Sequence, residues 1–169
     1  MIGDELYYLA FDNISGINFN ITASHKGILK IHFNVSKELK DKNTTVLHPD
    51  DPFMFGIFNQ LKEYFKRERK KFDVPLDIRG SDFQKKVWKE LLLIPYGRTV
   101  SYKYIAEKLG DVKTIRAVGK ANGMNPIPVI IPCHRVINSN GSLGGYSGGL
   151  SIKEKLLKIE GSLDMDLFQ

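Results

Sequence analysis

Residues 126–137 have the sequence Pro-Ile-Pro-Val-Ile-Ile-Pro-Cys-His-Arg-Val-Ile, an apolar run that contains the only cysteine of the chain. A free cysteine packs well as a small hydrophobe, so Cys133 is either a core residue or a nucleophile. Only the thiolate attacks, and positive charge nearby lowers the thiol pKa from its usual ~8.5. His134 and Arg135 follow directly and supply such charge. The stretch therefore predicts a reactive thiol in a dry pocket, with core packing as the alternative.

The contact between Cys133 and His134 depends on the backbone. In an extended strand, neighbouring side chains point to opposite faces, so the sulfur and the imidazole would not touch. Either the chain turns at this point, or a water molecule bridges the two groups.

An acidic side chain near the carboxyl terminus is a candidate partner for His134. Ser151 and Glu154 predict a capping box at the start of the last helix, and Gly161 predicts its end. Glu160 then lies in the last turn, where the helix dipole opposes a carboxylate, and on the apolar face. Two broken local rules are typical of a functional residue, so Glu160 is predicted to orient His134 in a catalytic triad. The alternative is a frayed surface glutamate.

Composition limits the classes of function. The chain has 169 residues and a net charge of +6, which favours an anionic partner, nucleic acid first. A single cysteine excludes an intramolecular disulfide and a zinc site built from several cysteines, and it is typical of a reducing compartment. The four histidines have no close metal-ligand spacing, so we expect no metal. No apolar run approaches ~20 residues and no secretory signal is present, so we expect a soluble intracellular protein.

The first third of the chain has the pattern of an antiparallel sheet. Apolar and polar residues alternate strictly over residues 17–22 and 29–35, which predicts strands with one wet face. Turn residues at 13–16 and 24–27 predict that these strands are neighbouring hairpins of a meander.

From Pro52 the apolar period becomes helical. The stripe that predicts an amphipathic helix consists of Met54, Ile57, Phe58, Leu61 and Phe65. The helix ends in Lys-Arg-Glu-Arg-Lys-Lys, residues 66–71, where the helix dipole favours basic residues. This basic run is either a solvated helix end or a DNA contact.

After a connector at residues 72–80, the pattern is helical again. Ser81 and Gln84 predict a capping box, and Thr99-Val100 predicts a short strand. Ser101 is expected to cap a short helix through Leu109, and a second helix is expected to follow Gly110-Asp111 and to end near Asn122. Two short helices around a tight glycine turn form the outline of a helix-turn-helix.

In the carboxyl-terminal half, the charged face of the second helix and a glycine-rich segment each have two possible interpretations. Lys113, Arg116 and Lys120 share one face of the second helix, where they either contact DNA or form an ordinary charged surface. Residues 138–150 are rich in glycine and carry Tyr146 and Ser147. They form either a flexible loop or a loop whose backbone approaches a flat ligand.

Taken together, these stretches resemble the O6-alkylguanine-DNA alkyltransferases. The resemblance centres on Pro-Cys-His-Arg-Val (132–136) and spans essentially all of residues 75–169. The supporting motifs are Phe-Gln-Lys-Lys-Val-Trp (83–88), Pro-Tyr-Gly-Arg-Thr-Val-Ser-Tyr (95–102), Arg-Ala-Val-Gly (116–119), Gly-Tyr-Ser-Gly-Gly-Leu (145–150) and Lys-Glu-Lys-Leu-Leu (153–157).

The resemblance implies an α+β fold with an RNase H-like amino-terminal domain at 1–74, a linker at 75–79 and a winged helix-turn-helix domain at 80–169. It also implies irreversible transfer of an alkyl group from O6-alkylguanine in double-stranded DNA to the protein's own cysteine, after the nucleotide flips out. No cofactor is needed, because the alkylated base is the activated donor. We expect a monomer in the cytoplasm, associated with the nucleoid, or in the nucleus of a eukaryote.

The same resemblance assigns a role to individual residues. Cys133 accepts the alkyl group, His134 takes its proton through a water, and Glu160 orients His134. Tyr102 rotates the nucleotide phosphate and protonates the departing guanine, and Asn125 is a hinge between the recognition helix and the active-site loop. The expected DNA contacts are Arg116, which replaces the flipped base, with Tyr102, Lys113, Lys120 and Arg135; the expected base pocket is Val136, Tyr146, Ser147 and Gly148.

Two other functions remain as alternatives. A non-catalytic sensor of alkylated bases would replace the reactive cysteine, whereas Cys133 is present. A helix-turn-helix regulator that senses oxidants or alkylators through its thiol would prefer one DNA sequence, whereas a repair protein would prefer the lesion.

Overall fold

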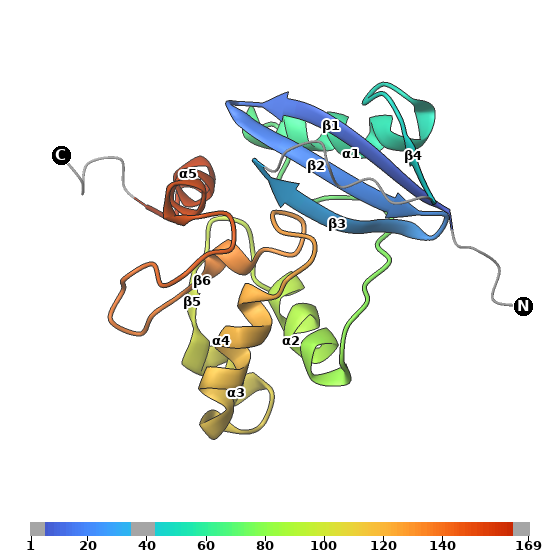
Figure 1. The fold of residues 1–169 in the computed structure, drawn as a ribbon. Helices are drawn as coiled ribbons and strands as arrows, with labels where there is room; N and C mark the ends of the chain where they lie inside the picture. Colours follow the sequence, from blue (N-terminus) through green and yellow to red (C-terminus); the bar gives the residue numbers. More distant parts are fainter. Residues whose placement is uncertain (1–5, 35–42, 164–169) are drawn as a thin grey trace, which may run out of the picture. The chain divides into compact units, whose positions relative to one another are not determined.

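The computed structural model describes residues 6–34 and 43–163, and the chain divides into two compact units, Met1–Ile78 and Arg79–Gln169 (Figure 1). The boundary falls inside the predicted linker, residues 75–79. Residues of this segment pair with the first unit: the Pro75 carbonyl accepts from the Ile28 amide, and the Asp77 amide donates to the Ile28 carbonyl.

The first unit contains a four-stranded sheet with the order β3-β2-β1-β4. The strands are β1 (Tyr7–Ile14), β2 (Ile17–Ser24), β3 (Gly27–Phe33) and β4 (Thr44–Val46). The first three form the predicted antiparallel meander, and β4 pairs parallel to β1. Phe19 and Ile21 of β2 are fully buried, as their alternation predicts, but Asn20 between them is buried too. The polar face of β2 is therefore only partly exposed to solvent.

The helix α1 (Pro52–Phe65) packs against β1 (Figure 1). Its first turn is fixed by Pro52 at the first helical position and by the Asp51 carboxylate, which accepts from the Phe53 amide at 3.0 Å. The buried stripe is Met54, Ile57, Phe58, Leu61 and Tyr64, whereas Phe65 is half-buried. The helix ends at Phe65, so the basic run of residues 66–71 lies beyond it.

In its described residues the second unit has four α-helices, of which the first three pack on one another, and a two-stranded parallel sheet. Its elements are α2 (Asp82–Leu92), β5 (Val100–Ser101), α3 (Tyr102–Lys108), the 3-10 turn Val112–Thr114, α4 (Ile115–Gly123), the 3-10 turn Cys133–Arg135, β6 (Val136–Ile137) and α5 (Leu150–Glu160). The indole of Trp88 on α2 is buried and donates to the Ala121 carbonyl of α4 at 2.9 Å. This bond links the first helix of the unit to the second helix of the helix-turn-helix.

Local signals place most of these helix ends. The Ser81–Gln84 capping box is present, and the Ser101 hydroxyl accepts from the Tyr104 amide at the start of α3. The capping box predicted from Ser151 and Glu154 is wrong: Gly149 is the N-cap, two residues earlier, so α5 begins at Leu150 and Ser151 lies inside the helix. Gly161 ends α5 in the left-handed conformation, as predicted.

No helix in the described parts of the chain is long and apolar enough to cross a membrane.

Candidate active site

The chain turns at the cysteine. Residues Cys133–Arg135 form a 3-10 turn, and the Arg135 amide donates to the Pro132 carbonyl at 3.0 Å. Just before it, Val129 adopts φ 75°, a strained conformation for a β-branched residue. The turn expected at this point is therefore present, and it brings the neighbouring side chains of His134 and Arg135 to the same carboxylate, that of Glu160.

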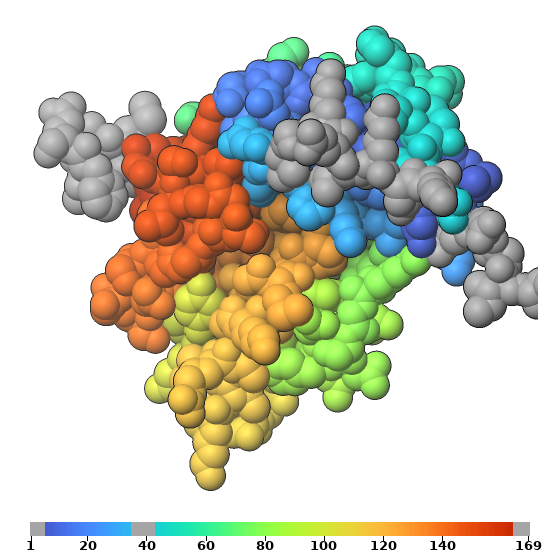
Figure 2. All heavy atoms as spheres, viewed as in Figure 1, coloured from blue at the N-terminus to red at the C-terminus, as the bar shows by residue number. Residues whose placement is uncertain are grey.

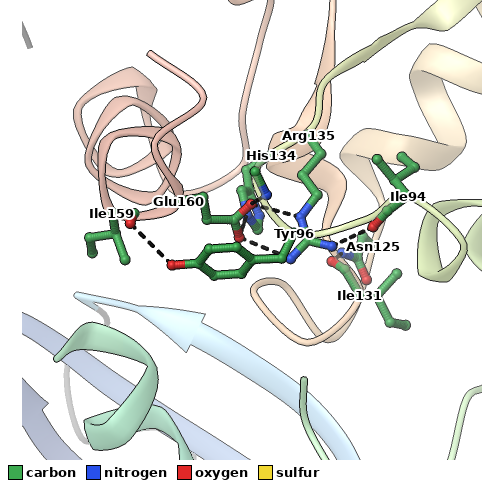
Figure 3. Close-up of polar contacts among 9 residues, drawn as sticks. Ile94, Tyr96, Asn125, Ile131, His134, Arg135, Ile159 and Glu160 are labelled. Atoms are coloured by element: carbon green, nitrogen blue, oxygen red, sulfur yellow. Dashed lines mark hydrogen bonds and ion pairs between the residues drawn. The ribbon is translucent and has the colours of Figure 1, made fainter. Parts of the chain in front are cut away.

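Glu160 is the centre of a buried polar cluster (Figure 3). Its Oε1 lies 2.8 Å from His134 Nε2 and accepts from Arg135 Nη2 at 3.0 Å. Its Oε2 accepts from Arg135 Nε at 2.8 Å and from the Gly97 amide at 3.2 Å. Burial alone would raise the pKa of Glu160, but the hydrogen bonds and charges of His134 and Arg135 outweigh it and lower the pKa to about 2. The carboxylate is therefore ionised at neutral pH.

The ionised carboxylate fixes the tautomer of His134. Nε2 carries the hydrogen that Glu160 accepts, which leaves Nδ1 as an acceptor. Nδ1 is buried and has no hydrogen-bond partner among the described residues. Burial lowers the pKa of His134, although Glu160 acts to raise it. The imidazole is thus a neutral base with a lone pair available for a proton.

Arg135 belongs to this cluster and not to the surface. Its side chain is 8% exposed, Nη1 donates to the Ile94 carbonyl at 2.5 Å, and the guanidinium lies 5.9 Å from the ring centre of Tyr96. The Tyr96 hydroxyl in turn donates to the Ile159 carbonyl (Figure 3). The sequence predicted a DNA contact for Arg135, whereas in this structure Glu160 and Ile94 hold its donors inside the protein.

Cys133 is 1% exposed, and its surroundings keep it protonated. Burial raises the pKa of the thiol to about 11, although hydrogen bonds from Asn125 and Tyr146 and the charge of Lys153 act in the opposite direction. The expectation that Arg135 supplies the positive charge for a thiolate is also wrong, because that charge is paired with Glu160. The resting protein holds a thiol that must lose its proton during a reaction.

Lys153 is a functional candidate that the sequence reasoning missed. Its side chain is fully buried, and Nζ donates to the carbonyls of Val136 at 2.7 Å, of Leu143, and of Gly145 at 3.5 Å. Burial lowers its pKa to about 8. The side chain therefore ties α5 to the glycine-rich loop and places a cation near the sulfur. A signal existed: like Glu160, Lys153 lies on the apolar face of α5.

Two asparagines join α4 to the cysteine segment. Asn125 donates to the Ile131 carbonyl at 2.7 Å and accepts from the Ile127 amide at 3.0 Å. Asn122, which was not predicted, is 3% exposed and donates to the Cys133 carbonyl at 3.4 Å. Both side chains therefore hold the backbone of the cysteine segment in place.

Tyr102, at the start of α3, faces this group. Its pKa is raised by burial and by Cys133, and a hydrogen bond with Asn122 acts in the opposite direction. Gly144 approaches it so closely that a Cβ there would lie 3.2 Å from the Tyr102 hydroxyl oxygen. The phenol therefore lies between α4, the glycine-rich loop and the thiol.

The predicted base-pocket residues divide into two groups. Val136 is buried and Tyr146 interacts with the thiol, so these two line the surroundings of Cys133. Ser147 is exposed and Gly148 is half-buried, so they lie nearer the surface of the same loop.

The predicted DNA-contacting residues on the helix-turn-helix are exposed. Arg116 and Lys120 lie on α4, whereas Lys113 belongs to the 3-10 turn before it. In Figure 2, α3 and α4 (yellow to orange) form one continuous surface. The unit Arg79–Gln169 has 14 lysines and arginines against 8 acidic residues, whereas Met1–Ile78 has 11 of each. The excess positive charge thus lies entirely in the second unit.

Among the described residues, no group of three His, Cys, Asp or Glu side chains is placed to hold a metal ion.

Comparison with known proteins identifies the family. The 6-O-methylguanine DNA methyltransferase family matches in two parts: its DNA binding domain matches residues 82–162, and its ribonuclease-like domain matches residues 18–78. A methylated-DNA–protein-cysteine methyltransferase of Mycobacterium tuberculosis is 42% identical over 166 residues, which cover 96% of this chain and 99% of that protein. The chain belongs to the 6-O-methylguanine DNA methyltransferase family. A methylated-DNA–protein-cysteine methyltransferase of Methanosarcina barkeri is 56% identical over 144 residues, which cover 83% of this chain and 88% of that protein.

Solved structures of family members have the same fold. The crystal structure of the M. tuberculosis O6-methylguanine methyltransferase superposes with a TM-score of 0.82 at 37% identity, over 96% of this chain and 98% of that chain. The M. tuberculosis protein in complex with DNA gives a TM-score of 0.82 at 39% identity, over 92% and 93%. The predicted α+β class, with a ribonuclease-like amino-terminal part and a winged helix-turn-helix, is confirmed.

Proposed function

We propose that this protein repairs DNA directly, by moving the alkyl group of O6-alkylguanine in duplex DNA onto the sulfur of Cys133. The observation that carries the proposal is the buried thiol next to a neutral histidine, whose Nδ1 can accept a proton and whose Nε2 is held by an ionised glutamate. Membership of the family supports the choice of substrate.

The first step is loss of the thiol proton. Because burial raises the pKa of Cys133 to about 11, the thiolate has to form as the alkyl group arrives. His134 accepts the proton at Nδ1 through a bridging water, and Glu160 stabilises the imidazolium. Lys153 and the donors of Asn125 and Tyr146 stabilise the negative sulfur.

The second step is a displacement at the alkyl carbon. The sulfur lone pair forms the new S–C bond while the C–O6 bond breaks, and its electrons stay on the guanine. Tyr102 donates its phenolic proton to the guanine, which makes the base a better leaving group. The product is a thioether on Cys133, which no group in the site can cleave, so each molecule acts once.

The substrate has to leave the helix before this step. The alkyl carbon is out of reach inside a duplex, so the nucleotide is extruded into the pocket around Val136, Tyr146, Ser147 and Gly148. Arg116 occupies the vacated position, which offsets part of the unstacking energy of a few kcal/mol.

The remaining contacts are independent of sequence. Lys113 and Lys120 bind backbone phosphates, as suits a lesion that arises anywhere. Asn125 acts as the hinge between α4 and the cysteine turn, in line with its bonds to Ile131 and Ile127.

The organisation of the chain follows from the same reasoning. We place the reaction in residues 80–169 and assign residues 1–74 to a ribonuclease-like domain, joined through 75–79. All proposed catalytic groups come from one chain, so the protein is expected to act as a monomer. Its substrate places it in the cytoplasm near the nucleoid, or in the nucleus of a eukaryote.

The test is the stoichiometry of repair. Increasing amounts of protein are incubated with duplex DNA that contains O6-methylguanine, and the remaining modified base is measured after hydrolysis of the DNA. One equivalent of protein should remove one equivalent of lesion, and Cys133→Ser should remove none. Removal of many lesions per molecule, or full activity of Cys133→Ser, would exclude the proposal. Binding without removal would identify a lesion sensor.

A further inference from the structure

A basic turn on the first unit takes no part in the proposed reaction. The basic turn consists of residues 66–71, Lys-Arg-Glu-Arg-Lys-Lys. It contains five of the eleven lysines and arginines between Met1 and Ile78. Because that unit has equal numbers of basic and acidic residues, the basic turn is a local concentration of positive charge on a neutral unit.

The backbone of the basic turn is a Schellman motif. The Arg67 amide donates to the Tyr64 carbonyl and the Glu68 amide to the Glu63 carbonyl, each at 2.9 Å, which satisfies the last carbonyls of α1. Arg67 takes the left-handed position with φ 64°. That position usually holds glycine, because a side chain is strained there.

The frame of the basic turn is held by side chains. Arg69 Nε donates to Glu63 Oε2 at 2.6 Å, and its Nη1 donates to the Lys71 carbonyl at 2.9 Å. Gln60 closes the segment through two bonds with the backbone of Asp73, at 2.8 and 2.9 Å. Arg69 is thus part of this frame. The other four cations of the basic turn, Lys66, Arg67, Lys70 and Lys71, are exposed.

The helix dipole does not account for this charge. Its attraction for cations falls off within the last turn of a helix, whereas Lys70 and Lys71 follow the end of α1 at Phe65 by five and six residues. Exposed cations on a fixed backbone can bind the phosphates of a nucleic acid, and such contacts do not depend on the base sequence.

We propose that the basic turn is a second DNA-contact surface, which binds backbone phosphates and is distinct from the helix-turn-helix. The proposal rests on DNA being the partner of this protein, as proposed above. It gives the first unit a role in holding the protein on DNA without a role in the chemistry.

The first experiment compares two double variants of the full chain that change the net charge equally. Lys70→Gln/Lys71→Gln removes cations from the basic turn, and Lys26→Gln/Lys30→Gln removes two exposed cations elsewhere on the same unit. Affinity for a long undamaged duplex is measured by fluorescence anisotropy from about 50 to 200 mM salt.

The two variants should differ in salt dependence. Each lost phosphate contact lowers the slope of log affinity against log salt by about 0.9, so the basic-turn variant loses about 1.8 and the control stays near wild type. Between about 50 and 200 mM salt, the factor by which the affinity of the basic-turn variant falls should therefore be about twelve times smaller than the factor for wild type. Equal slopes for the two variants would overturn the proposal.

The second experiment separates contact from folding. Arg67→Gly removes one cation and relieves the left-handed strain, so Tm should rise by a few degrees while the salt slope falls by about 0.9. A damaged fold would lower both Tm and affinity. Unchanged affinity of Arg67→Gly would contradict the proposal. Removal of O6-methylguanine by wild-type protein tests the proposed function separately, because the affinity comparison uses undamaged DNA.

Discussion

Replacing Glu160 with glutamine removes the charge at the centre of the buried cluster. The wild-type carboxylate accepts one hydrogen bond from His134, two from Arg135 and one from the Gly97 amide. A glutamine has only one acceptor oxygen, so its amide group points a donor at another donor. Arg135, which is 8% exposed, also loses its counter-charge.

Two routes give the magnitude. Lowering the pKa of Glu160 from 4.5 to about 2 corresponds to about 3 kcal/mol of stability at pH 7, at about 1.4 kcal/mol for each pKa unit. Removing one partner of a buried ion pair typically costs about 3–5 kcal/mol. We expect Glu160→Gln to lower the free energy of unfolding by about 3 kcal/mol at pH 7.

The pH dependence has a definite sign. The carboxyl binds its proton more weakly in the folded state, so its stabilisation is complete above about pH 4.5 and is lost as the pH falls towards about 2. Urea unfolding of both proteins from pH 7 to pH 3 should therefore show a difference that shrinks below pH 4.5.

Glu154→Gln is the matched control, because its ion pair with Lys158 on the same helix is partly exposed and the change should cost less than about 1 kcal/mol. Single-turnover transfer by Glu160→Gln should slow roughly a hundredfold with DNA affinity nearly unchanged, since the histidine loses its orienting acceptor. A difference below about 1 kcal/mol at pH 7, or one that stays constant down to pH 3, would refute the account of the cluster.

Three further substitutions test the surroundings of the thiol. Lys153→Met should slow transfer at least about tenfold in single-turnover assays, because the loop carbonyls lose their donor and the sulfur its cation; an unchanged rate would remove Lys153 from the site. Tyr102→Phe should slow transfer from O6-methylguanine by about a hundredfold but leave the reaction of Cys133 with iodoacetamide unchanged, since that leaving group needs no proton; equal losses in both would contradict its role as an acid. Gly144→Ala should lower the free energy of unfolding by about 1 kcal/mol and slow transfer, because φ is +67° and the new methyl group would lie 3.2 Å from the Tyr102 hydroxyl. No effect on urea unfolding or on the rate of transfer would contradict the packing described.

The sequence predicts those parts of the site that break a local rule. Glu160 was found because a carboxylate on an apolar helix face near the carboxyl end violates two preferences, and the structure places it against His134. Lys153 and Asn122 break the same rule, as polar residues on the inner faces of α5 and α4. Unlike Glu160, they break only this one preference, so their sequence signal is weaker.

Other features depend on tertiary structure and leave no local signal. The turn at Cys133 is prepared by Val129 in a conformation that its side chain disfavours, so propensity predicts an extended chain there. Arg135 is basic and adjacent to the cysteine, and only the fold shows that Glu160 and Ile94 hold it inside. The parallel strand β4 has three residues, too few for a pattern of alternation. The meander and α1 were predicted because their patterns run over many residues.

The most direct measurement is the mass of the protein after reaction with duplex DNA that contains O6-methylguanine. The intact protein should gain the mass of one methyl group and no more, and a peptide map should place it on Cys133. The Cys133→Ser variant should gain nothing. An unmodified protein after the lesion has disappeared, or a methyl group on any other residue, would contradict transfer to this sulfur.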